Sequence, residues 1–226
     1  MPANKLAYQL IRTKRKTLGL TIERDGKIVI RAPQDSPQKV IDDFFESKKF
    51  WIYKKLAEKR MIEEDLPSKE YVNGEGFLYL GKSYRLQLVD NGVPLSLSHG
   101  FFQLNRKYAS KGKKTFTDWY RSHALPIIEE RVKIYKDMIG VNPKTIRVLD
   151  LKYRWGSCSS KGNLNLHWKT ILTPMPIVDY VVIHELVHLK EKNHTQRFWE
   201  ILATILPDYE KRKEWLKING NHFELD

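Results

Sequence analysis

The residues best suited to chemistry are two histidines four apart with a glutamate after the first, His184-Glu185-Leu186-Val187-His188. On a helix, residues four apart lie on one face, so both imidazoles can reach the same metal ion. Glu185 would project near that metal without binding it, where it can act as a general base on water. The spacing therefore predicts a metal site equipped for hydrolysis.

A third ligand is expected from His194, six residues after His188. The polar stretch over 190–193 can turn the chain back, and Asn193 readily adopts left-handed backbone at a helix end. His194 would then meet the metal from the start of the next helix. Three protein ligands with one open position are typical of a catalytic zinc site rather than a structural one.

Other residues are alternatives for the third position. His167 and His222 carry the same imidazole group as His194. Cys158 is a rival of another kind, because peptide deformylases combine a cysteine thiolate with two histidines and a catalytic glutamate. The glycine and glutamine motifs of the deformylases are missing here, so we expect Cys158 to be a small buried residue in a tight hairpin.

The residues around the motif also favour a metal. The stretch Ile177–Lys190 is apolar almost all round, as expected of a helix at the centre of a fold. Two imidazoles and a carboxylate would be costly to bury there without a metal or another partner. His99 and His123 lie far from the motif in the sequence, and we expect them to be structural.

Five further residues are candidates for supporting roles. Tyr180 precedes the first histidine by one turn on the same face, so its hydroxyl could stabilise an oxyanion, although simple packing also explains a tyrosine there. Arg154 and Trp155 would shape a cleft or only their own hairpin. Asp179 and Asp208 are candidate hydrogen-bond partners of the ligand imidazoles.

The first third of the chain predicts a small sheet and a helix. Alternating apolar residues indicate three strands, and an apolar stripe indicates a long helix beginning at Ser36-Pro37: strands over 8–13, 18–24 and 27–32, and a helix over 37–64. Asp25-Gly26 is a hairpin signal between the second and third strands, because type I′ turns need positive φ.

The remaining two thirds predict further strands and the helices that hold the motif. Strands are expected over 77–80, 84–89, 101–104, 145–151 and 163–168, and helices over 115–139, 177–190, 196–206 and 209–218. Pro126 should kink or split the helix over 115–139, and Gly140 should end it. The turn-rich stretch over 154–162 should form a hairpin with the strand that follows.

We expect an α+β fold with two parts. The polar stretch over 109–114 is the preferred seam, so the expected domains are a strand-rich part with one long helix over 1–110 and a catalytic core over 111–226. The content of 41% hydrophobic residues is enough for a core and excludes wholesale disorder. No apolar run is long enough to span a bilayer, and no signal-peptide core is present.

The net charge and the cysteine count indicate possible binding partners and the cellular compartment. The chain has 40 basic and 27 acidic residues, a net charge of +13 spread evenly along it, with denser basic stretches over 12–16 and 48–60. Solvated faces explain this simply, and a nucleic-acid-facing surface is the alternative. A single cysteine excludes internal disulfides, and we expect a cytoplasmic location.

Several motifs together resemble one family, the YgjP-like metallopeptidases, which are related to SprT-type and Spartan-type proteases. The resemblance is carried by Arg154-Trp-Gly-Ser-Cys-Ser, Asn163-Leu-Asn-Leu, 179–189, Asn193-His194, Phe198-Trp199, 15–22, Arg31-Ala-Pro and Lys49-Phe-Trp-Ile. It implies a zincin-like core, in which a small sheet packs on the two-histidine helix beside a cleft. It also implies one Zn²⁺ per chain, bound by His184, His188 and His194, with Glu185 as the catalytic base.

The leading hypothesis is a zinc metallopeptidase acting on extended or unfolded polypeptides. A substrate segment could add as a strand beside residues 145–152 or 163–167. One alternative is a nucleic-acid-associated protein with conditional protease activity, which the basic charge favours. Another is a catalytically silent zinc scaffold, against which Glu185 stands, because a structural site does not need it. No membrane partner is expected, and the oligomeric state is left open.

Overall fold

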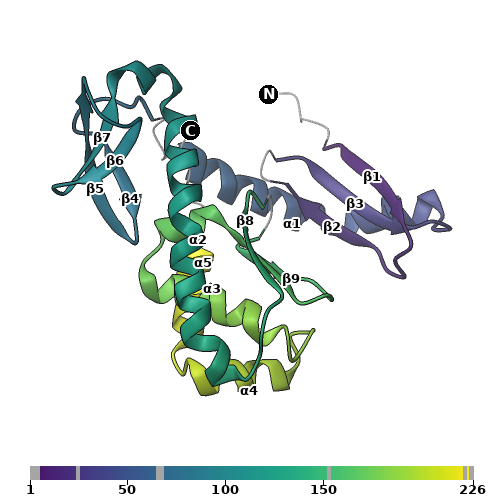
Figure 1. Ribbon diagram of the computed structural model, residues 1–226. Coiled ribbons are helices and arrows are strands. Elements are labelled where there is room, and N and C mark those ends of the chain that lie inside the picture. Colours follow the sequence, from purple (N-terminus) through teal and green to yellow (C-terminus); the bar gives the residue numbers. More distant parts are fainter. Residues whose placement is uncertain (1–5, 24–25, 65–68, 152–153, 221–222, 224–226) are drawn as a thin grey trace. The chain divides into compact units, whose positions relative to one another are not determined.

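A computed structural model describes residues 6–23, 26–64, 69–151, 154–220 and 223, and the side chains of 58–64 are not considered (Figure 1). The chain separates into two compact units, Met1–Pro67 and Ser68–Asp226. Each unit has its own cluster of buried apolar side chains. This division differs from the expected seam near residue 110, because the sheet that precedes that seam shares a core with the helix that follows it.

The first unit is a three-stranded sheet with one long helix. The strands are β1 (Tyr8–Thr13), β2 (Gly19–Ile22) and β3 (Ile28–Pro33), and the helix is α1 (Gln38–Glu64). β3 lies between the other two, parallel to β1 and antiparallel to β2. The predicted strands and helix are confirmed. Gly26 has a φ of 80°, as the hairpin signal requires, whereas Asp25 lies outside the described residues.

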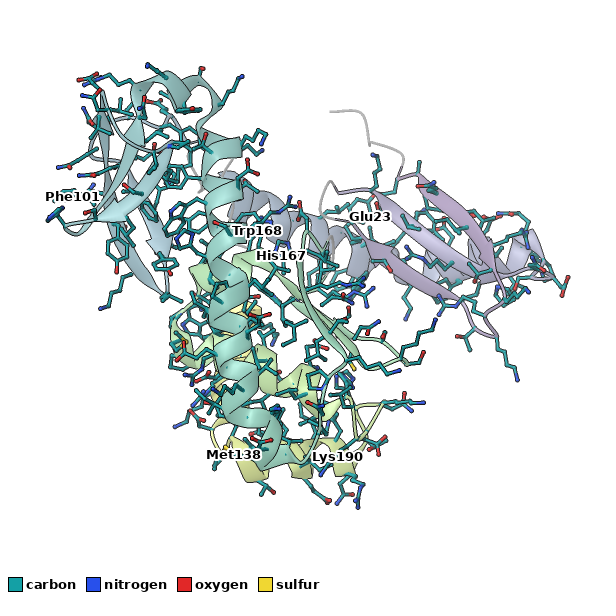
Figure 2. The ribbon with its side chains drawn as sticks, in the orientation of Figure 1. Glu23, Phe101, Met138, His167, Trp168 and Lys190 are labelled. Carbon is teal, nitrogen blue, oxygen red and sulfur yellow. The ribbon has the colours of Figure 1, made fainter. Side chains whose placement is uncertain are left out.

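The second unit begins with a four-stranded sheet, whose side chains are drawn in Figure 2. Its strands are β4 (Gly76–Tyr79), β5 (Lys82–Val89), β6 (Leu95–Ser98) and β7 (Phe101–Asn105), in the order β4-β5-β7-β6. The sequence did not predict β6, which is only four residues long. The strands pack on the next helix: the rings of Phe77 and Phe116 stack at 4.0 Å, and the Tyr120 hydroxyl donates to the Leu78 carbonyl.

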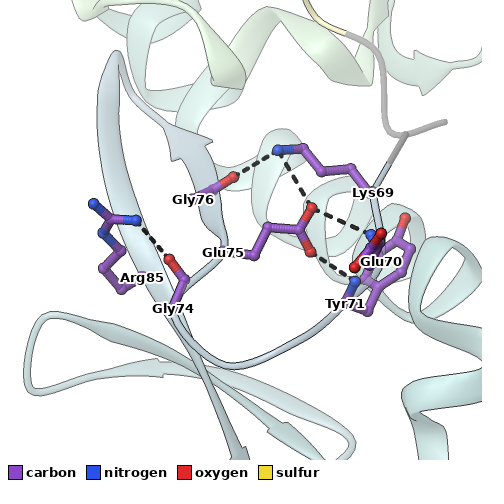
Figure 3. Close-up of polar contacts among 7 residues, drawn as sticks. All are labelled: Lys69, Glu70, Tyr71, Gly74, Glu75, Gly76 and Arg85. Atoms are coloured by element: carbon purple, nitrogen blue, oxygen red, sulfur yellow. Dashed lines mark hydrogen bonds and ion pairs between the residues drawn. The ribbon is translucent and has the colours of Figure 1, made fainter. Parts of the chain in front are cut away.

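The segment that leads into β4 is held by a carboxylate (Figure 3). Glu75 accepts hydrogen bonds from the backbone N–H groups of Glu70, at 3.3 Å, and Tyr71, at 2.6 Å. The Lys69 ammonium lies 3.7 Å from the same carboxylate. These contacts compensate for the left-handed backbone of Tyr71, whose φ is 58°.

Helix α2 (Gly112–Ile139) is the longest element of the second unit and follows a short 3₁₀ helix, η1 (Arg106–Lys111). It runs from the β4–β7 sheet to the helices that follow (Figure 1). Every fourth residue is buried: Phe116, Tyr120, Ala124, Ile128 and Val132. Pro126 lies within this single helix, so the helix is not split. Gly140 ends it with a φ of 73°, as predicted.

A second sheet of three strands follows α2. Its strands are β8 (Thr145–Leu149), β9 (Gly156–Cys158) and β10 (Asn163–His167), in the order β8-β10-β9. β10 is parallel to β8 and antiparallel to β9, which confirms the predicted hairpin. The outer edges of the described sheet therefore belong to β8 and β9, and not to β10.

Helix α3 (Met175–Val187) lies at the centre of the second unit, after a 3₁₀ helix, η2 (Trp168–Leu172). It is buried on nearly all sides, as predicted, and it ends three residues before the predicted Lys190. Helices α4 (Gln196–Ile205) and α5 (Tyr209–Asn219) follow it. The fold class is α+β, as expected. Within the described part of the chain, none of the helices has the length and apolar character required to cross a bilayer.

Candidate metal centre

A cavity of about 910 Å³ opens beside the buried helix α3. One wall is residues 154–162, which include β9, and another is α3 with the loop after it. His184, Glu185, His188 and His194 all line this space. Helix α3 and the loop after it thus bring the whole predicted constellation into one cavity.

The three histidines form a compact group. One nitrogen from each ring of His184, His188 and His194 lies within 4.8 Å of the other two. The Nε2 atoms of His184 and His194 are 3.0 Å apart. Two imidazoles bound to one tetrahedral metal ion at a metal–nitrogen distance of ~2.0–2.1 Å would have their nitrogens about 3.3 Å apart. The group is therefore spaced to hold a metal ion.

The third histidine reaches the group through a short loop. His188 is the C-cap of α3, and its Nδ1 lies 3.1 Å from the Glu191 carbonyl oxygen. Thr195 is the N-cap of the next helix, α4, and its hydroxyl accepts a hydrogen bond from the Phe198 N–H. Asn193 does not have the left-handed backbone that the sequence predicted. The Thr195 N–H bonds to the Asn193 carbonyl instead, so this turn is closed without positive φ.

The environment favours the neutral form of two of the imidazoles, His184 and His194. Burial, together with the charges of His188, His194 and Lys213, lowers the pKa of His184 to about 3. Burial, His188 and Lys213 also lower the pKa of His194. A neutral imidazole has a free lone pair, which is the form that binds a metal. The donor chemistry of the three residues therefore fits a metal ion.

Glu185 lies deep in the cavity wall. Its side chain is buried, and burial raises its pKa to about 8, while the positive charge of Arg154 acts in the opposite direction. Its Oε2 is buried without a hydrogen-bond partner among the described residues. Gly156 makes this position accessible, because a Cβ there would lie 2.5 Å from Oε1. A buried carboxylate with an unused oxygen beside three imidazoles is suited to exchange protons with water in the cavity.

Aromatic rings surround the group. The buried ring of Phe198 lies 4.9 Å from the His184 ring and 4.7 Å from each of the rings of His188 and His194. Phe198 thus forms an apolar floor under all three imidazoles. A low-polarity floor strengthens electrostatic interactions above it.

The comparison with known proteins now identifies the family. The profile described as YgjP-like, metallopeptidase domain, matches residues 16–219. The chain belongs to the YgjP-like metallopeptidase family. The match covers most of the sequence and confirms the resemblance carried by its motifs. Metallopeptidases as a family are hydrolases that use a metal ion.

One curated relative of this YgjP-like chain has a different name. It is the UTP pyrophosphatase of Escherichia coli strain K12, which is 26% identical over 81 residues, 36% of this chain and 46% of that protein. The chain thus spans about half the length of the curated relative that it matches.

Two solved structures are also similar to part of this chain. They are the metallopeptidase zymogens abylysin of Pyrococcus abyssi and jannalysin of Methanocaldococcus jannaschii, at 22% and 26% identity. They cover 41% and 40% of this chain and 93% and 92% of their own, with TM-scores of 0.38 and 0.36.

Three of the five supporting candidates of the YgjP-like chain reach the cavity. Tyr180 lies in its wall with its ring 5.8 Å from that of His184, and burial raises the pKa of its hydroxyl to about 12. Arg154 is exposed at the rim, whereas Trp155 packs against Phe223 at 6.0 Å. The hydroxyl of Tyr180 is therefore protonated at neutral pH, and its ring lies beside the group of three histidines.

The two candidate aspartates have other partners, so the sequence-based expectation for them is corrected. Asp179 is buried and forms a two-pronged ion pair with Arg131 of α2, with Nε–Oδ1 at 2.5 Å. Asp208 pairs with Arg212 at 3.0 Å, and that hydrogen bond lowers the pKa of the Asp208 carboxyl. Each carboxylate is thus used to join helices or to stabilise one, not to orient an imidazole.

The alternative third ligands stay outside the histidine group. Cys158 lines the cavity, but burial raises the pKa of its thiol, and its Sγ lies 3.6 Å from the Ser159 carbonyl oxygen. His167 is fully buried, accepts a hydrogen bond from the Lys169 N–H, and faces Asp150 at 3.3 Å. His222 lies outside the described residues. His99 lies in a turn and His123 on α2, and neither belongs to the group.

The sequence did not predict the cluster of positive charges at the rim of the cavity. Four basic side chains contribute to its lining, while Glu185 is the acidic residue in the lining that the structure describes: Lys144, Arg154, Lys161 and Lys192. The lysines come from three separate segments, so no local motif marks them. Lys213 of α5 also acts on the site through its charge, again without a local signal.

Proposed function

We propose that this protein is a zinc-dependent peptidase in which His184, His188 and His194 hold the ion and Glu185 is the general base. The observation that carries the proposal is the shared cavity, in which three imidazoles converge beside one buried carboxyl group. Imidazole ligands and an open cavity favour zinc, since catalytic zinc sites combine three protein ligands with one free position. A structural site has no need of an unpaired buried glutamate.

The residues of the chain can perform the proton transfers of peptide hydrolysis. A bound zinc ion would act as a Lewis acid on water and on the scissile carbonyl. Glu185 would accept a proton from the attacking water and return it to the leaving amine, and a pKa near the working pH suits both steps. The Tyr180 hydroxyl, protonated at neutral pH, would donate a hydrogen bond to the developing oxyanion.

An extended polypeptide would bind along β9. Of the two strand regions expected beside the cleft, 163–167 is β10, whose two edges are already paired with β8 and β9. β9 pairs with β10 alone in the described sheet, and its residues Gly156–Cys158 line the cavity. Backbone hydrogen bonds to this edge would favour unfolded substrates with weak side-chain preference.

The single cysteine favours a reducing compartment, so a cytoplasmic location is part of the proposal.

The test combines elemental analysis with cleavage of a denatured protein such as casein. The wild type should contain about one zinc per chain and cleave the substrate, and His194→Ala should lose the zinc. Glu185→Gln should keep the zinc and lose at least ~100-fold in rate, the usual contribution of a general base. Cys158→Ser is the matched control and should keep both properties.

Two results would contradict the proposal. Zinc lost in Cys158→Ser but kept in His194→Ala would move the site to a cysteine-containing ligand set. An activity that Glu185→Gln leaves unchanged, or a zinc-loaded wild type that cleaves no polypeptide, would favour the silent scaffold.

A second candidate function is hydrolysis of a phosphoanhydride in a nucleoside triphosphate. The name of the curated relative suggests it, and the four basic side chains at the cavity rim are the observation that favours it. Cationic groups stabilise the charge of transferring phosphoryl groups. Release of pyrophosphate from UTP by the wild type, abolished in Glu185→Gln and at high salt, would support this function. UTP left intact by a zinc-loaded protein would remove it.

Nucleic-acid association remains a proposal for the first unit. Aromatic side chains on the solvent face of α1 interleave with lysines: Phe50 is 83% exposed, and Trp51 and Tyr53 are also exposed beside Lys48 and Lys54. Stacking rings and lysines together suit single-stranded nucleic acid. Binding of a fluorescent oligonucleotide should weaken steeply with salt and with Phe50→Ala and Trp51→Ala. Absence of binding at low salt would contradict it.

A further inference from the structure

The three ligand histidines are held in different ways. Metal-binding histidines usually donate their second ring N–H to an oxygen, which fixes the orientation of the ring. His188 has such a partner in the Glu191 carbonyl, 3.1 Å from its Nδ1. His184 projects from a buried helix. His194 is exposed in a loop, and within the described residues the hydrogen-bonding contact of its ring is with His184 alone.

Ring packing replaces the missing hydrogen bond at His194. The indole of Trp199 stacks on the His194 imidazole, with ring centroids 5.5 Å apart and an interplanar angle of 26°. Phe198 meets the same imidazole edge-on at 4.7 Å. A stacked face and an edge together restrict rotation of the imidazole. Trp199 also approaches the His184 ring, at 6.2 Å.

Trp199 is in turn held by the last helix. The Tyr209 ring stacks on it at 5.4 Å with an interplanar angle of 19°. The Lys213 ammonium lies 4.2 Å from the centre of the Trp199 ring, which is within the range of a cation–π contact. These contacts connect α5 to the histidine group through one indole.

We infer that Trp199 is a positioning residue that orients His194 for the metal, and that Tyr209 and Lys213 hold Trp199 in place. The inference rests on the proposed metal site. It gives a role to the second residue of the Phe198-Trp199 motif, which the hydrolytic chemistry does not use. It also makes α5, whose residues are not ligands, part of the support of the metal centre.

The test measures zinc affinity by competition with a chelator, in two backgrounds. Trp199→Leu should weaken zinc binding by about 10–100-fold in the wild-type background, as loss of a ligand-orienting contact does. In the His194→Ala background, whose weak residual zinc binding is measured at higher free zinc, the same change should alter the affinity by less than about twofold. Trp199→Phe, which keeps an aromatic face, should retain most of the affinity. An equal loss in both backgrounds, or none in the first, would overturn the inference.

Matched controls separate orientation from general packing. Trp215→Leu removes a half-buried indole of α5 that packs on Phe223 and should leave zinc affinity unchanged at a similar cost in melting temperature. Lys217→Met, on the same helix but paired with Glu214, should also have no effect, whereas Tyr209→Leu should weaken zinc binding. Equal weakening by Trp215→Leu would count against a specific role for Trp199.

A measurement on the metal-free protein keeps this test separate from the proposed function. In the free protein, the stacked indole should shift the His194 ring protons upfield in the NMR spectrum. Trp199→Leu should remove that shift, and Trp215→Leu should not. An unchanged His194 spectrum would overturn the inference even if zinc binds. A wild type that binds no zinc but shows the shift would contradict the proposed function and not the packing.

Discussion

Gly156 is the residue whose substitution is most informative about the catalytic geometry. A Cβ at this position would lie 2.5 Å from Glu185 Oε1 and 2.6 Å from Glu185 Cγ, and Glu185 is fixed in a buried helix. The smallest side chain would therefore push the carboxylate out of place. The three histidines do not depend on this space.

We predict that Gly156→Ala keeps zinc and loses activity. A displacement of about 1 Å in a catalytic group can lower the rate by about 100-fold. The measurement is kcat/KM on a denatured protein together with zinc content, with Gly162→Ala as a loop control whose nearest neighbour, Leu189 Cδ2, would be 3.6 Å away. Gly162 has a φ of 81°, so its variant also measures the effect of strain in the same hairpin. Full activity in Gly156→Ala would contradict the assigned position of Glu185.

At the level of secondary-structure elements, one largely buried ion pair joins helix α2 to helix α3, the helix that carries His184 and Glu185. Arg131 of α2 meets Asp179 of α3, and their side chains are only 19% and 11% exposed. The Arg131 guanidinium also contacts the Tyr135 hydroxyl at 3.1 Å. Asp179 lies five residues before His184, the first of the proposed metal ligands on α3, so the pair helps to set the position of that helix against α2.

We predict that Arg131→Met destabilises the fold by about 3–5 kcal/mol, because Asp179 would remain as an uncompensated buried charge. Urea unfolding measures the change. Arg131→Met combined with Asp179→Leu should recover most of the loss, since replacing both partners removes the buried charge. As a control, Lys217→Met breaks an exposed pair with Glu214 and should cost less than about 1 kcal/mol. A loss below ~1 kcal/mol in Arg131→Met would show that the pair is solvated.

At the scale of the whole molecule, the two units have separate cores. The apolar cluster of the first unit is formed by the sheet β1–β3 and α1, and that of the second by the elements from β4 onward. All three proposed metal ligands belong to the second unit. A ligand stabilises only the cooperative unit that binds it.

We predict that zinc raises the melting temperature of the second unit alone. At a free zinc concentration 100 times the dissociation constant, the stabilisation is about 2.7 kcal/mol. Scanning calorimetry of the full chain with zinc and with a chelator should show one transition that moves and one that does not. His194→Ala should abolish the shift. A single transition that moves as a whole would contradict the independence of the two units.

Local sequence patterns were sufficient to predict most of the elements and the proposed metal ligands. The spacing of His184 and His188 depends only on the pitch of one helix, and His194 follows within one short loop. Alternation and turn residues were sufficient for the hairpins β2–β3 and β9–β10, because neighbouring residues determine them. The strand β6, four residues long, and the short 3₁₀ helices η1 and η2 were missed, and α3 ends three residues before the predicted Lys190.

Which distant groups meet became visible only in the folded chain. It placed Gly156 against Glu185, paired Asp179 with Arg131, brought Lys213 to Trp199, and moved the boundary between units to residue 67. It also showed that Asn193 does not need left-handed backbone. Periodicity records which face of an element is apolar, but not which partner covers that face. Contacts between residues far apart in the chain depend on how all the elements pack together, and no short stretch of sequence carries that information.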